Sequence, residues 1–192
     1  MLKAKGRQPS REAILDAAVT EFAARGYDGV RIEHVARRSG FNKTLVYRHF
    51  SDKGNLFREC LRHQFQRRET MLMEIPGAVS DALVWWSRQQ REDRDFVRLI
   101  LREALADSGA EPVDAKRRRA YYKRQVEQIR KLQKEGDIDA TLDSEMLFFA
   151  MLALTVAPVV LPQIARLIAA APPRAFATRW DRFLQELAAK LE

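Results

Sequence analysis

Residues 35–50 read VARRSGFNKTLVYRHF, in which Gly40 separates two short apolar patterns. After that glycine, Val46 and Phe50 lie four residues apart, the spacing that places two side chains on one face of an α-helix. A glycine between two helices of two turns permits a tight turn with a positive φ angle. The stretch therefore predicts a helix-turn-helix whose two helices pack through their apolar faces.

The second of these helices, predicted over about residues 43–50 with Asn42 as its N-cap, has two contrasting faces. Its polar side chains cluster apart from the apolar pair: Lys43, Thr44, Tyr47 and Arg48. Lysine and arginine can neutralise phosphates or bond guanine, and hydroxyl groups can bond phosphates or base edges. Any exposed helix has a polar face, but the shortness of this helix, the glycine turn before it and the capped helix after it favour a DNA reader.

Neighbouring side chains, which include the N-cap residue Asn42, extend this predicted DNA surface. Leu45 can contact a thymine methyl group, and His49 either contacts DNA or packs against its own domain. Ser51 and Asp52 begin the next helix, whose N-terminal amides, assisted by Lys53, can hold a phosphate. The sequence therefore predicts a compact set of base and phosphate contacts.

The bulk composition is compatible with a DNA-binding chain. The 192 residues are 31% charged and 46% hydrophobic, the profile of a globular chain that buries a core. The formal net charge is +8, and residues 1–60 hold 12 Lys and Arg against 7 Asp and Glu, so the positive excess is densest around the helix-turn-helix. A single cysteine, Cys60, and the lack of a signal-peptide or membrane-span pattern favour a cytoplasmic protein without disulfides.

The rest of the chain has helical periodicity and almost no strand-like alternation. A first helix is predicted to begin at an N-cap, Ser10, and to end at Gly26. After the helix-turn-helix and the helix that follows it, five more helices are predicted, over about residues 79–90, 92–108, 112–135, 142–170 and 173–191. Pro158 and Pro162 should kink or break the fourth of these. The fold class predicted is all-α, with about nine helices.

Catalytic and metal sites find little support in the sequence. The three histidines, His34, His49 and His63, have no cysteine or carboxylate partner at a metal-binding spacing, and Cys60 has no base near it in the sequence. Neither a G-x-S-x-G pattern nor a phosphate-binding loop occurs. The sequence therefore predicts a protein that is not an enzyme and that uses no metal or cofactor.

The stretches SREAILDAAVTEFAARGYDG and VARRSGFNKTLVYRHFSDKGNLF resemble the N-terminal domain of the TetR family of bacterial transcriptional regulators. The resemblance covers about residues 8–60 and rests on Ile14, Leu15, Ala17, Ala18, Phe22, Gly26, Tyr27, Val35, Ala36, Gly40, Lys43, Val46, Tyr47, Phe50, Lys53 and Leu56. It implies a three-helix DNA-binding domain, assigned to residues 1–55, and a larger ligand-binding and dimerisation domain over residues 56–192. It also implies a homodimer on a near-palindromic operator, from which a small ligand releases the protein.

Position by position, the resemblance implies that one set of side chains faces DNA: Lys43, Thr44, Leu45, Tyr47, Arg48 and His49. Tyr47 and Lys53 match positions that usually hold phosphate. The chain departs from the family at Arg31, where a Ser/Thr pair commonly begins the second helix, and we expect Arg31 to replace that phosphate contact. Thr44 and Leu45 also depart from the usual small residue and threonine, so the base preference need not follow any relative.

Two further predictions concern the second domain. A pocket for a small amphipathic or apolar ligand is predicted between its middle helices, with Arg102 as an anchor for an anionic group. The candidate lining consists of Trp85, Trp86, Phe96, Leu99, Arg102, Tyr121, Tyr122, Met146, Phe149 and Met151. Each of these residues also suits an ordinary hydrophobic core.

Two helices of each chain are predicted to pair with those of a second copy in a four-helix bundle: the apolar helix over residues 142–170, and the last helix, whose apolar stripe also includes Leu184. The residues of this candidate dimer interface are Phe176, Trp180, Phe183 and Leu187. The alternative is that both helices fold into the core of their own chain.

These features together predict a homodimeric DNA-binding regulator, a repressor more readily than an activator, that binds double-stranded DNA and a small organic ligand. The alternative is a helical protein-interaction or small-molecule-binding protein in which the DNA-binding head is not the main activity. The operator, the ligand and the regulated genes stay open at this point.

Overall fold

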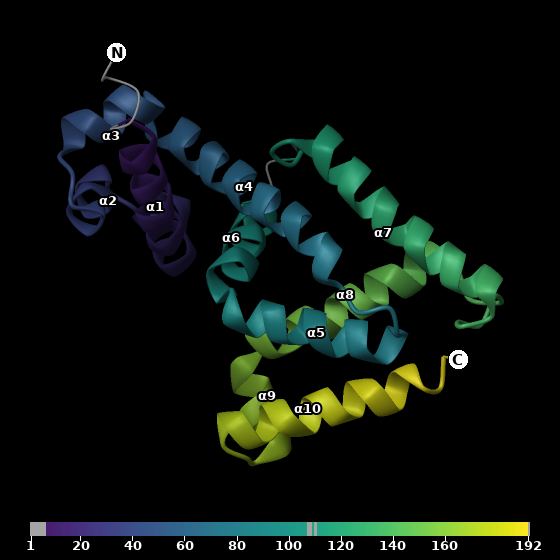
Figure 1. Cartoon of the computed structure of the whole chain (residues 1–192). Helices are drawn as coiled ribbons and strands as arrows, with labels where there is room; N and C mark the ends of the chain where they lie inside the picture. Colours follow the sequence, from purple (N-terminus) through teal and green to yellow (C-terminus); the bar gives the residue numbers. More distant parts are fainter. Residues whose placement is uncertain (1–6, 107–108, 110, 192) are drawn as a thin grey trace. The chain divides into compact units, whose positions relative to one another are not determined.

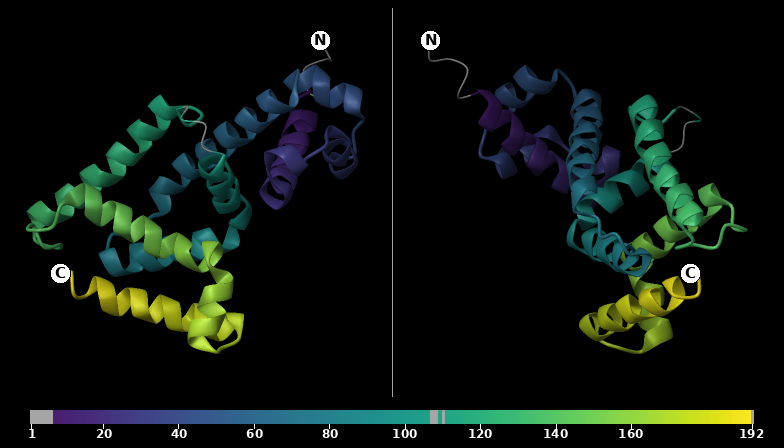
Figure 2. Two further views of the ribbon diagram at one scale, coloured as in Figure 1. Left: turned by 180° about the vertical axis from the view of Figure 1, so that it is seen from behind. Right: turned by 45° about the vertical axis from the view of Figure 1, so that its right-hand side comes forward.

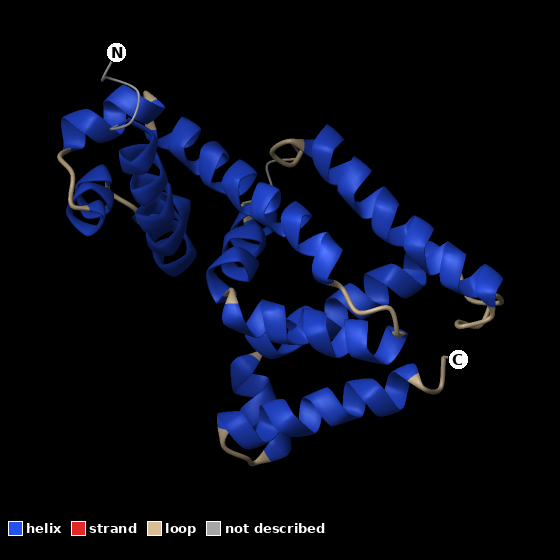
Figure 3. Cartoon of the chain, in the orientation of Figure 1, coloured by secondary structure: helices blue, strands red, loops and turns tan. Residues whose placement is uncertain are grey.

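Helices, turns and loops make up the described chain (Figure 3). The structure, a computed structural model, describes residues 7–106, 109 and 111–191, and within these ranges it contains no strand. The α-helices are α1 Arg7–Gly29, α2 Ile32–Ser39, α3 Lys43–Phe50, α4 Lys53–Thr70, α5 Val79–Glu92, α6 Arg94–Leu105, α7 Ala115–Glu135, α8 Ser144–Val160, α9 Pro162–Ala169 and α10 Pro173–Ala188. A short 3-10 helix, η1, spans Met71–Glu74. The all-α prediction is confirmed.

The helix predicted over residues 142–170 is two helices in the structure, and this division explains why ten α-helices are described instead of about nine. α8 ends at Val160 and α9 begins at Pro162, with a bend of 85° between them. Pro162 has no amide hydrogen to donate and its ring excludes a preceding helical turn, so a new helix begins there. Within the described ranges no single helix is long and apolar enough to cross a membrane, and α8 with α9 meets those criteria only as this bent pair.

The contacts between helices divide the chain into two compact units that do not follow the order of the sequence. The first unit combines residues 1–70 with residues 98–115, and the second combines residues 71–97 with residues 116–192. The boundary predicted after residue 55 lies inside α4. α6 begins in the second unit and ends in the first. In Figure 1 and in both views of Figure 2, α1, α2 and α3 of the first unit gather into one group.

The first unit is a small helical core built on α1. α1 packs against α2, α3 and α4, and α3 also packs against α2 and α4. All of these helices, and α6, contribute buried side chains to its core: Ile14, Leu15, Phe22, Val35, Val46, Phe50, Leu56, Leu61 and Leu99. Val46 and Phe50 are each 1% exposed, which confirms the prediction that they hold α3 to its neighbours.

α1 changes direction at Gly26, where the backbone leaves the helical region with φ 70° and ψ 175°. That combination of angles is strained for any residue that carries a Cβ atom. A Cβ atom at this position would lie 3.6 Å from the Arg102 side chain, which is an ordinary van der Waals contact. The requirement for glycine at position 26 is therefore conformational and not steric.

Gly26→Ala should lower the free energy of unfolding by about 1–3 kcal/mol, because alanine would have to adopt a backbone conformation that is nearly exclusive to glycine. Urea denaturation followed by circular dichroism measures this loss as a lower midpoint with an unchanged slope. Gly77→Ala is the matched control, since Gly77 has no positive φ and a Cβ atom there would meet no described atom within 4 Å. Equal midpoints for the two variants would contradict a conformational role for Gly26.

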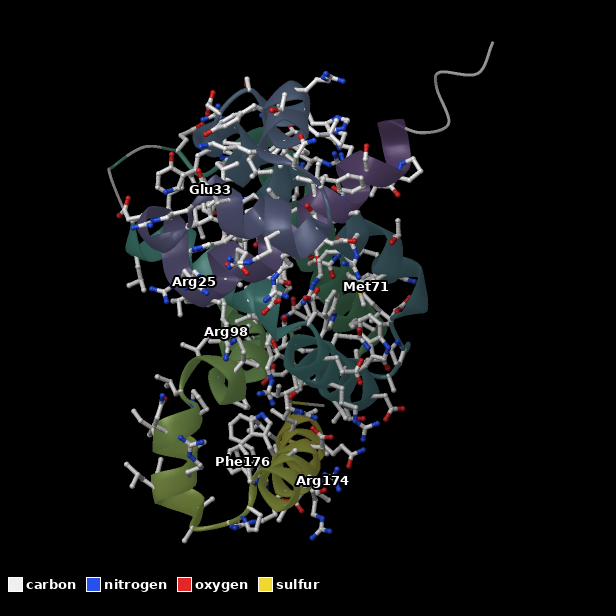
Figure 4. All side chains as sticks on the ribbon, turned by 90° about the vertical axis from the view of Figure 1, so that its left-hand side faces the viewer. Arg25, Glu33, Met71, Arg98, Arg174 and Phe176 are labelled. Carbon is white, nitrogen blue, oxygen red and sulfur yellow. The ribbon has the colours of Figure 1, made fainter. Side chains whose placement is uncertain are left out.

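The second unit is organised around α5, which packs against both α8 and α10. Leu83 of α5 and two residues of α10, Leu184 and Ala188, belong to its buried core. The Oδ1 atom of Asp181 on α10 accepts a hydrogen bond of 2.7 Å from Nη2 of Arg91 on α5. α10 is therefore fixed to α5 by apolar burial and by an ion pair. α9 also contacts α10, on the side where Figure 4 shows Phe176.

Candidate nucleic-acid interface

α3 is held at its N-terminus by the cap that the sequence predicts. The Oδ1 atom of Asn42 accepts a hydrogen bond of 2.9 Å from the backbone N–H of Leu45, which satisfies an amide of the first turn. The turn before it contains Gly40 with φ 76°, and the next residue, Phe41, donates its backbone N–H to the carbonyl of Ala36 at 3.0 Å. This turn closes α2 in the left-handed conformation that favours glycine. The predicted helix-turn-helix is therefore present.

The polar face of α3 is turned to solvent. Lys43, Thr44, Tyr47 and Arg48 are all exposed, and the Tyr47 ring is 41% exposed in spite of its size. Among the residues that the structure describes, none forms a hydrogen bond or an ion pair with the Arg48 side chain. A long, planar cation without an internal partner suits recognition of guanine, which offers two acceptors in the major groove.

Lys43 has a partner that the sequence did not reveal. Its Nζ atom donates to Oε1 of Glu33 on α2 at 2.5 Å and lies 5.8 Å from the centre of the Tyr47 ring. The hydrogen bond from Lys43 lowers the pKa of the Glu33 carboxyl, and the same bond raises the pKa of the Lys43 ammonium. Figure 4 labels Glu33 in the first unit, and its side chain is 56% exposed. The two groups are therefore ionised together over the physiological pH range.

Lys53, at the first residue of α4, lies over an aromatic ring. Its Nζ atom is 4.6 Å from the centre of the Tyr27 ring and 3.4 Å from the Asp28 carbonyl oxygen. The Oδ1 atom of Asp52 accepts a hydrogen bond of 2.7 Å from the backbone N–H of Asn55, which confirms that Asp52 caps α4. A carboxylate thus already occupies part of the place predicted for a phosphate. Tyr27, 39% exposed, is the neighbour of Lys53 that sequence reasoning did not include.

The remaining predicted DNA contacts differ in their surroundings. His49 is half-buried, and its Nε2 atom lies 3.1 Å from Oγ of Ser10, so its ring is directed toward α1. Ser10 itself is not the N-cap that was predicted, because α1 already includes Arg7. Leu45 is half-buried against the core of the first unit, whereas Arg31 is exposed at the N-cap of α2 and makes no capping hydrogen bond.

Glu21 joins α1 to α2 beneath this surface. Its Oε1 atom accepts from Nε of Arg38 at 2.8 Å, and its Oε2 atom accepts from Nε of Arg25 at 2.9 Å. Burial acts to raise the pKa of the Glu21 carboxyl, but the hydrogen bonds and charges of the two arginines outweigh it, so the pKa lies below its ordinary value. The ionised carboxylate therefore stabilises the packing of α2 on α1.

Glu21→Gln should lower the free energy of unfolding by about 1–2 kcal/mol at neutral pH, because it removes the charge that pairs with Arg25 and Arg38. The loss stays this small because both arginines are half-exposed, and water weakens their ion pairs with Glu21. Because the folded-state pKa is depressed, this contribution is present above about pH 4.5 and is lost as the pH falls through the folded value. Urea midpoints at pH 7 and at pH 4, compared with the exposed control Glu12→Gln, measure it. An unchanged difference between the two variants at both pH values would contradict the ionic role.

The structure does not bring the predicted ligand residues together in one unit. Leu99 is fully buried in the core of the first unit, and Arg102 of the same unit is exposed beside Gly26, while the other predicted lining residues belong to the second unit. Aromatic pairs are present there: the rings of Trp85 and Trp86 are 4.8 Å apart, and those of Tyr121 and Tyr122 are 5.2 Å apart. The remaining residues divide between buried Phe96, half-buried Met151 and exposed Met146 and Phe149. The sequence grouped these residues by composition and could not foresee that α6 is shared between the units.

The apolar stripe of α10 is divided in the same way. Trp180 packs against the core of the second unit, and Phe176 stacks on it with ring centres 5.9 Å apart. Leu187 is half-buried, and Phe183 is 44% exposed. Part of the stripe therefore contributes to the fold of its own chain, and Phe183 is the residue of the predicted dimer set that is most accessible to a second copy.

α8 has an exposed apolar face that sequence reasoning did not separate from the rest of the helix. Met146, Phe149, Ala150 and Ala153 all lie exposed at the spacing i, i+3, i+4, i+7, which defines one helix face. Met146 is 63% and Phe149 is 66% exposed. The helix is apolar nearly all round, so the sequence pattern could not indicate which face the core covers.

Metal-binding side chains are not grouped in the part of the chain that the structure describes. Within those ranges, no group of three or more His, Cys, Asp or Glu side chains is arranged to hold a metal ion. Cys60 is buried, and this burial raises the pKa of its thiol well above the ordinary value, so it is a poor nucleophile.

Known families match both parts of the chain. Residues 14–60 match the family model described as bacterial regulatory proteins of the tetR family. Residues 86–189, which are more than half of the chain, match the model described as the tetracyclin repressor-like C-terminal domain. The two matches together include the helix-turn-helix and most of the second unit.

Individual proteins are similar over nearly the whole length. The HTH-type transcriptional repressor SCO4008 of Streptomyces coelicolor is 28% identical over 170 residues, which cover 87% of this chain and 87% of the relative. The crystal structure of the putative transcriptional regulator SCO4942 from Streptomyces coelicolor has a TM-score of 0.73 at 21% identity, covering 93% of this chain and 97% of that chain. GusR of Salmonella enterica has a TM-score of 0.65 at 24% identity, covering 94% of this chain and 96% of that chain. The two solved structures establish a likeness of fold.

Proposed function

The chain belongs to the TetR family of bacterial regulatory proteins, and from this premise we propose that it is a homodimeric repressor released from its operator by a small ligand. Membership of the family makes it a DNA-binding transcription regulator. We add four parts to this: repression, dimerisation, a response to a ligand and a cytoplasmic location. Repression agrees with the similarity to a transcriptional repressor over 87% of the chain.

One observation carries the DNA-binding part of the proposal, namely the division of α3 into two faces. Val46 and Phe50 are buried, so the helix is fixed, while Tyr47 and Arg48 are exposed on another face. A recognition helix needs both properties, because it has to protrude into the major groove without losing its orientation. In this proposal Arg48 reads a base, and Lys43 and Thr44 contact base edges or phosphates.

Phosphate contacts surround this helix in the proposal. The hydroxyl group of Tyr47 and the ammonium group of Lys53 hold the DNA backbone, and exposed Arg31 supplies a contact at the start of α2. We add Tyr27 to this set, because its ring positions Lys53 at 4.6 Å. His49 and Leu45 are assigned mainly to packing, since both are half-buried in the first unit.

The dimer in this proposal forms through the exposed apolar face of α8, together with Phe183 of α10. A face with Met146 and Phe149 more than 60% exposed is unusual for a helix that has no partner. A two-fold axis would let the same face serve both copies and would give two recognition helices. For helix-turn-helix dimers, half-sites lie about one helical turn of DNA apart, roughly 34–36 Å.

The ligand in this proposal binds among the aromatic side chains of the second unit. Trp85, Trp86, Tyr121 and Tyr122 provide apolar surface with few polar groups, which suits an amphipathic or apolar organic molecule. α6 offers a route for the response, since its first residues belong to the second unit and Leu99 is buried in the core of the first. A ligand that moves α6 would then act on the core to which α3 is fixed.

Fluorescence anisotropy with the DNA that flanks the gene tests the proposed function. Tight binding that weakens steeply between about 50 and about 200 mM salt is expected, since phosphate neutralisation drives much of the affinity. Addition of an apolar compound that raises the melting temperature should release the DNA. Binding that is absent or insensitive to salt would contradict the DNA-binding part, and thermal stabilisation without release would contradict the ligand response.

A further inference from the structure

The ion pair between Glu33 and Lys43 joins the two helices of the helix-turn-helix at the DNA-binding surface. Lys43 is the first residue of α3, and Glu33 is in the first turn of α2. The Lys43 side chain is 50% exposed and the Glu33 side chain is 56% exposed, so neither group is needed to fill the core. Arg31 adds a further positive charge close enough to lower the pKa of Glu33. An acidic group thus lies among the cations that are proposed to meet the phosphates.

A carboxylate in this place has two opposite effects on DNA binding. It repels phosphates and occupies the ammonium group of Lys43, which lowers the affinity for any DNA. It also fixes the end of a flexible four-carbon chain, since Nζ of Lys43 donates to Oε1 of Glu33 at 2.5 Å and lies 5.8 Å from the centre of the Tyr47 ring. A fixed donor loses less entropy when it meets a base acceptor at one position.

We propose, on the basis of the proposed DNA-binding function, that Glu33 is a specificity-determining residue that positions Lys43. Glu33 keeps Lys43 away from phosphates and holds the Lys43 ammonium group at one place along α3. The affinity for the correct site therefore rises relative to the affinity for other DNA. Discrimination is a difference between two affinities, and a group that weakens the wrong complex contributes to it as well as one that strengthens the right complex.

Glu33→Gln tests this role on two DNA probes. One probe is a duplex recovered with the unsubstituted protein from a random-sequence pool, and the other is a mixed-sequence duplex without that site. On the mixed-sequence duplex the variant should bind more tightly, and the slope of log affinity against log salt should steepen by about 0.9 for each recognition helix, because Lys43 is then able to neutralise a phosphate. Between about 50 and about 200 mM salt this corresponds to an additional loss of about 3.5-fold per helix.

The ratio of affinities for the two probes is the decisive measurement. Glu33→Gln should lower this ratio about three- to tenfold, because the affinity for the mixed-sequence duplex rises and the base contact of Lys43 is weakened. Glu186→Gln on α10 is the control, because it makes the same change in net charge at an exposed residue of the other unit. In a Lys43→Gln background, Glu33→Gln should leave the salt slope unchanged, since the effect acts through Lys43.

Three results would overturn the inference. Glu33→Gln could match Glu186→Gln in both slope and ratio, or its effect could persist in full without Lys43. Alternatively it could weaken the selected duplex alone, which would mean that Glu33 itself accepts a hydrogen bond from a cytosine amino group. An unsubstituted protein that binds neither duplex in a salt-dependent way would overturn the proposed function, and the inference with it. Because both side chains are half-exposed, unchanged thermal melting is expected and confirms that each variant is folded.

Discussion

Arg48→Ala is expected to lower the affinity for the selected operator by about 5- to 150-fold, the range for losing one good bidentate contact to a base. The structure gives two reasons for this size of effect. Arg48 is exposed on α3, and no described residue pairs with its side chain, so its donors are available to DNA. The helix that carries it is fixed by Val46 and Phe50, which limits the freedom of the arginine to find another partner.

The change in sequence preference distinguishes base reading from phosphate binding. Selection from a random pool should return a relaxed preference at one position in each half-site for Arg48→Ala. Tyr47→Phe is the matched comparison on the same face: it should weaken binding to all duplexes to a similar degree, since a hydroxyl group on a phosphate carries no sequence information. A uniform loss for Arg48→Ala across every duplex would show that Arg48 does not read a base.

The helix-turn-helix could be predicted from the sequence because its determinants are local. The spacing of Val46 and Phe50, the N-cap Asn42 and the glycine turn at Gly40 all act within one or two helical turns, and the structure confirms each of them. Local rules of this kind need no knowledge of how helices cross. The same rules indicated a kink or break at Pro158 and at Pro162. The helix breaks at Pro162, where the chain has no amide hydrogen to continue it, whereas Pro158 lies inside α8.

The contacts of the surface depend on crossing angles that spacing does not encode. The pair Glu33–Lys43 spans ten residues and two helices, and Lys53 meets Tyr27, which is 26 residues earlier in the chain. His49 illustrates the same limit, since its position on α3 permits a DNA contact but its distance of 3.1 Å to Ser10 directs it toward α1. A polar residue on a helix can be assigned to a partner only after the helices are placed.

The second unit was harder to predict because apolar composition does not say which face is buried. α8 is apolar nearly all round, and only the structure separates the face that packs on α5 from the face with Met146 and Phe149. In α10 the sequence indicated a single stripe, yet Leu184 is fully buried and Phe183 is 44% exposed. The division between core and candidate interface therefore comes from packing and not from the pattern.

Phe149→Glu is expected to convert the proposed dimer into a monomer. In an isologous interface the two copies meet through the same face, so the substitution would place a carboxylate from each copy in an apolar contact. Sedimentation should report half the mass, and the affinity for a duplex with two half-sites should fall by at least about 100-fold, because the two recognition helices are no longer linked. Binding to a single half-site should be unchanged, and so should the melting temperature at low concentration, since Phe149 is 66% exposed within its own chain.

Two companion variants decide which helix carries the interface. Gln185→Glu adds the same side chain to an exposed polar position of α10 and should leave the dimer intact. Phe183→Glu places the charge at the exposed end of the α10 stripe, and we expect partial dissociation from it, since less apolar surface is exposed there than on α8. If Phe183→Glu yields monomers while Phe149→Glu stays dimeric, α10 is the interface and the exposed face of α8 has another purpose. A dimer that survives both substitutions would exclude both faces as the interface. In that case neither variant should lose affinity for the duplex with two half-sites, because its recognition helices stay linked.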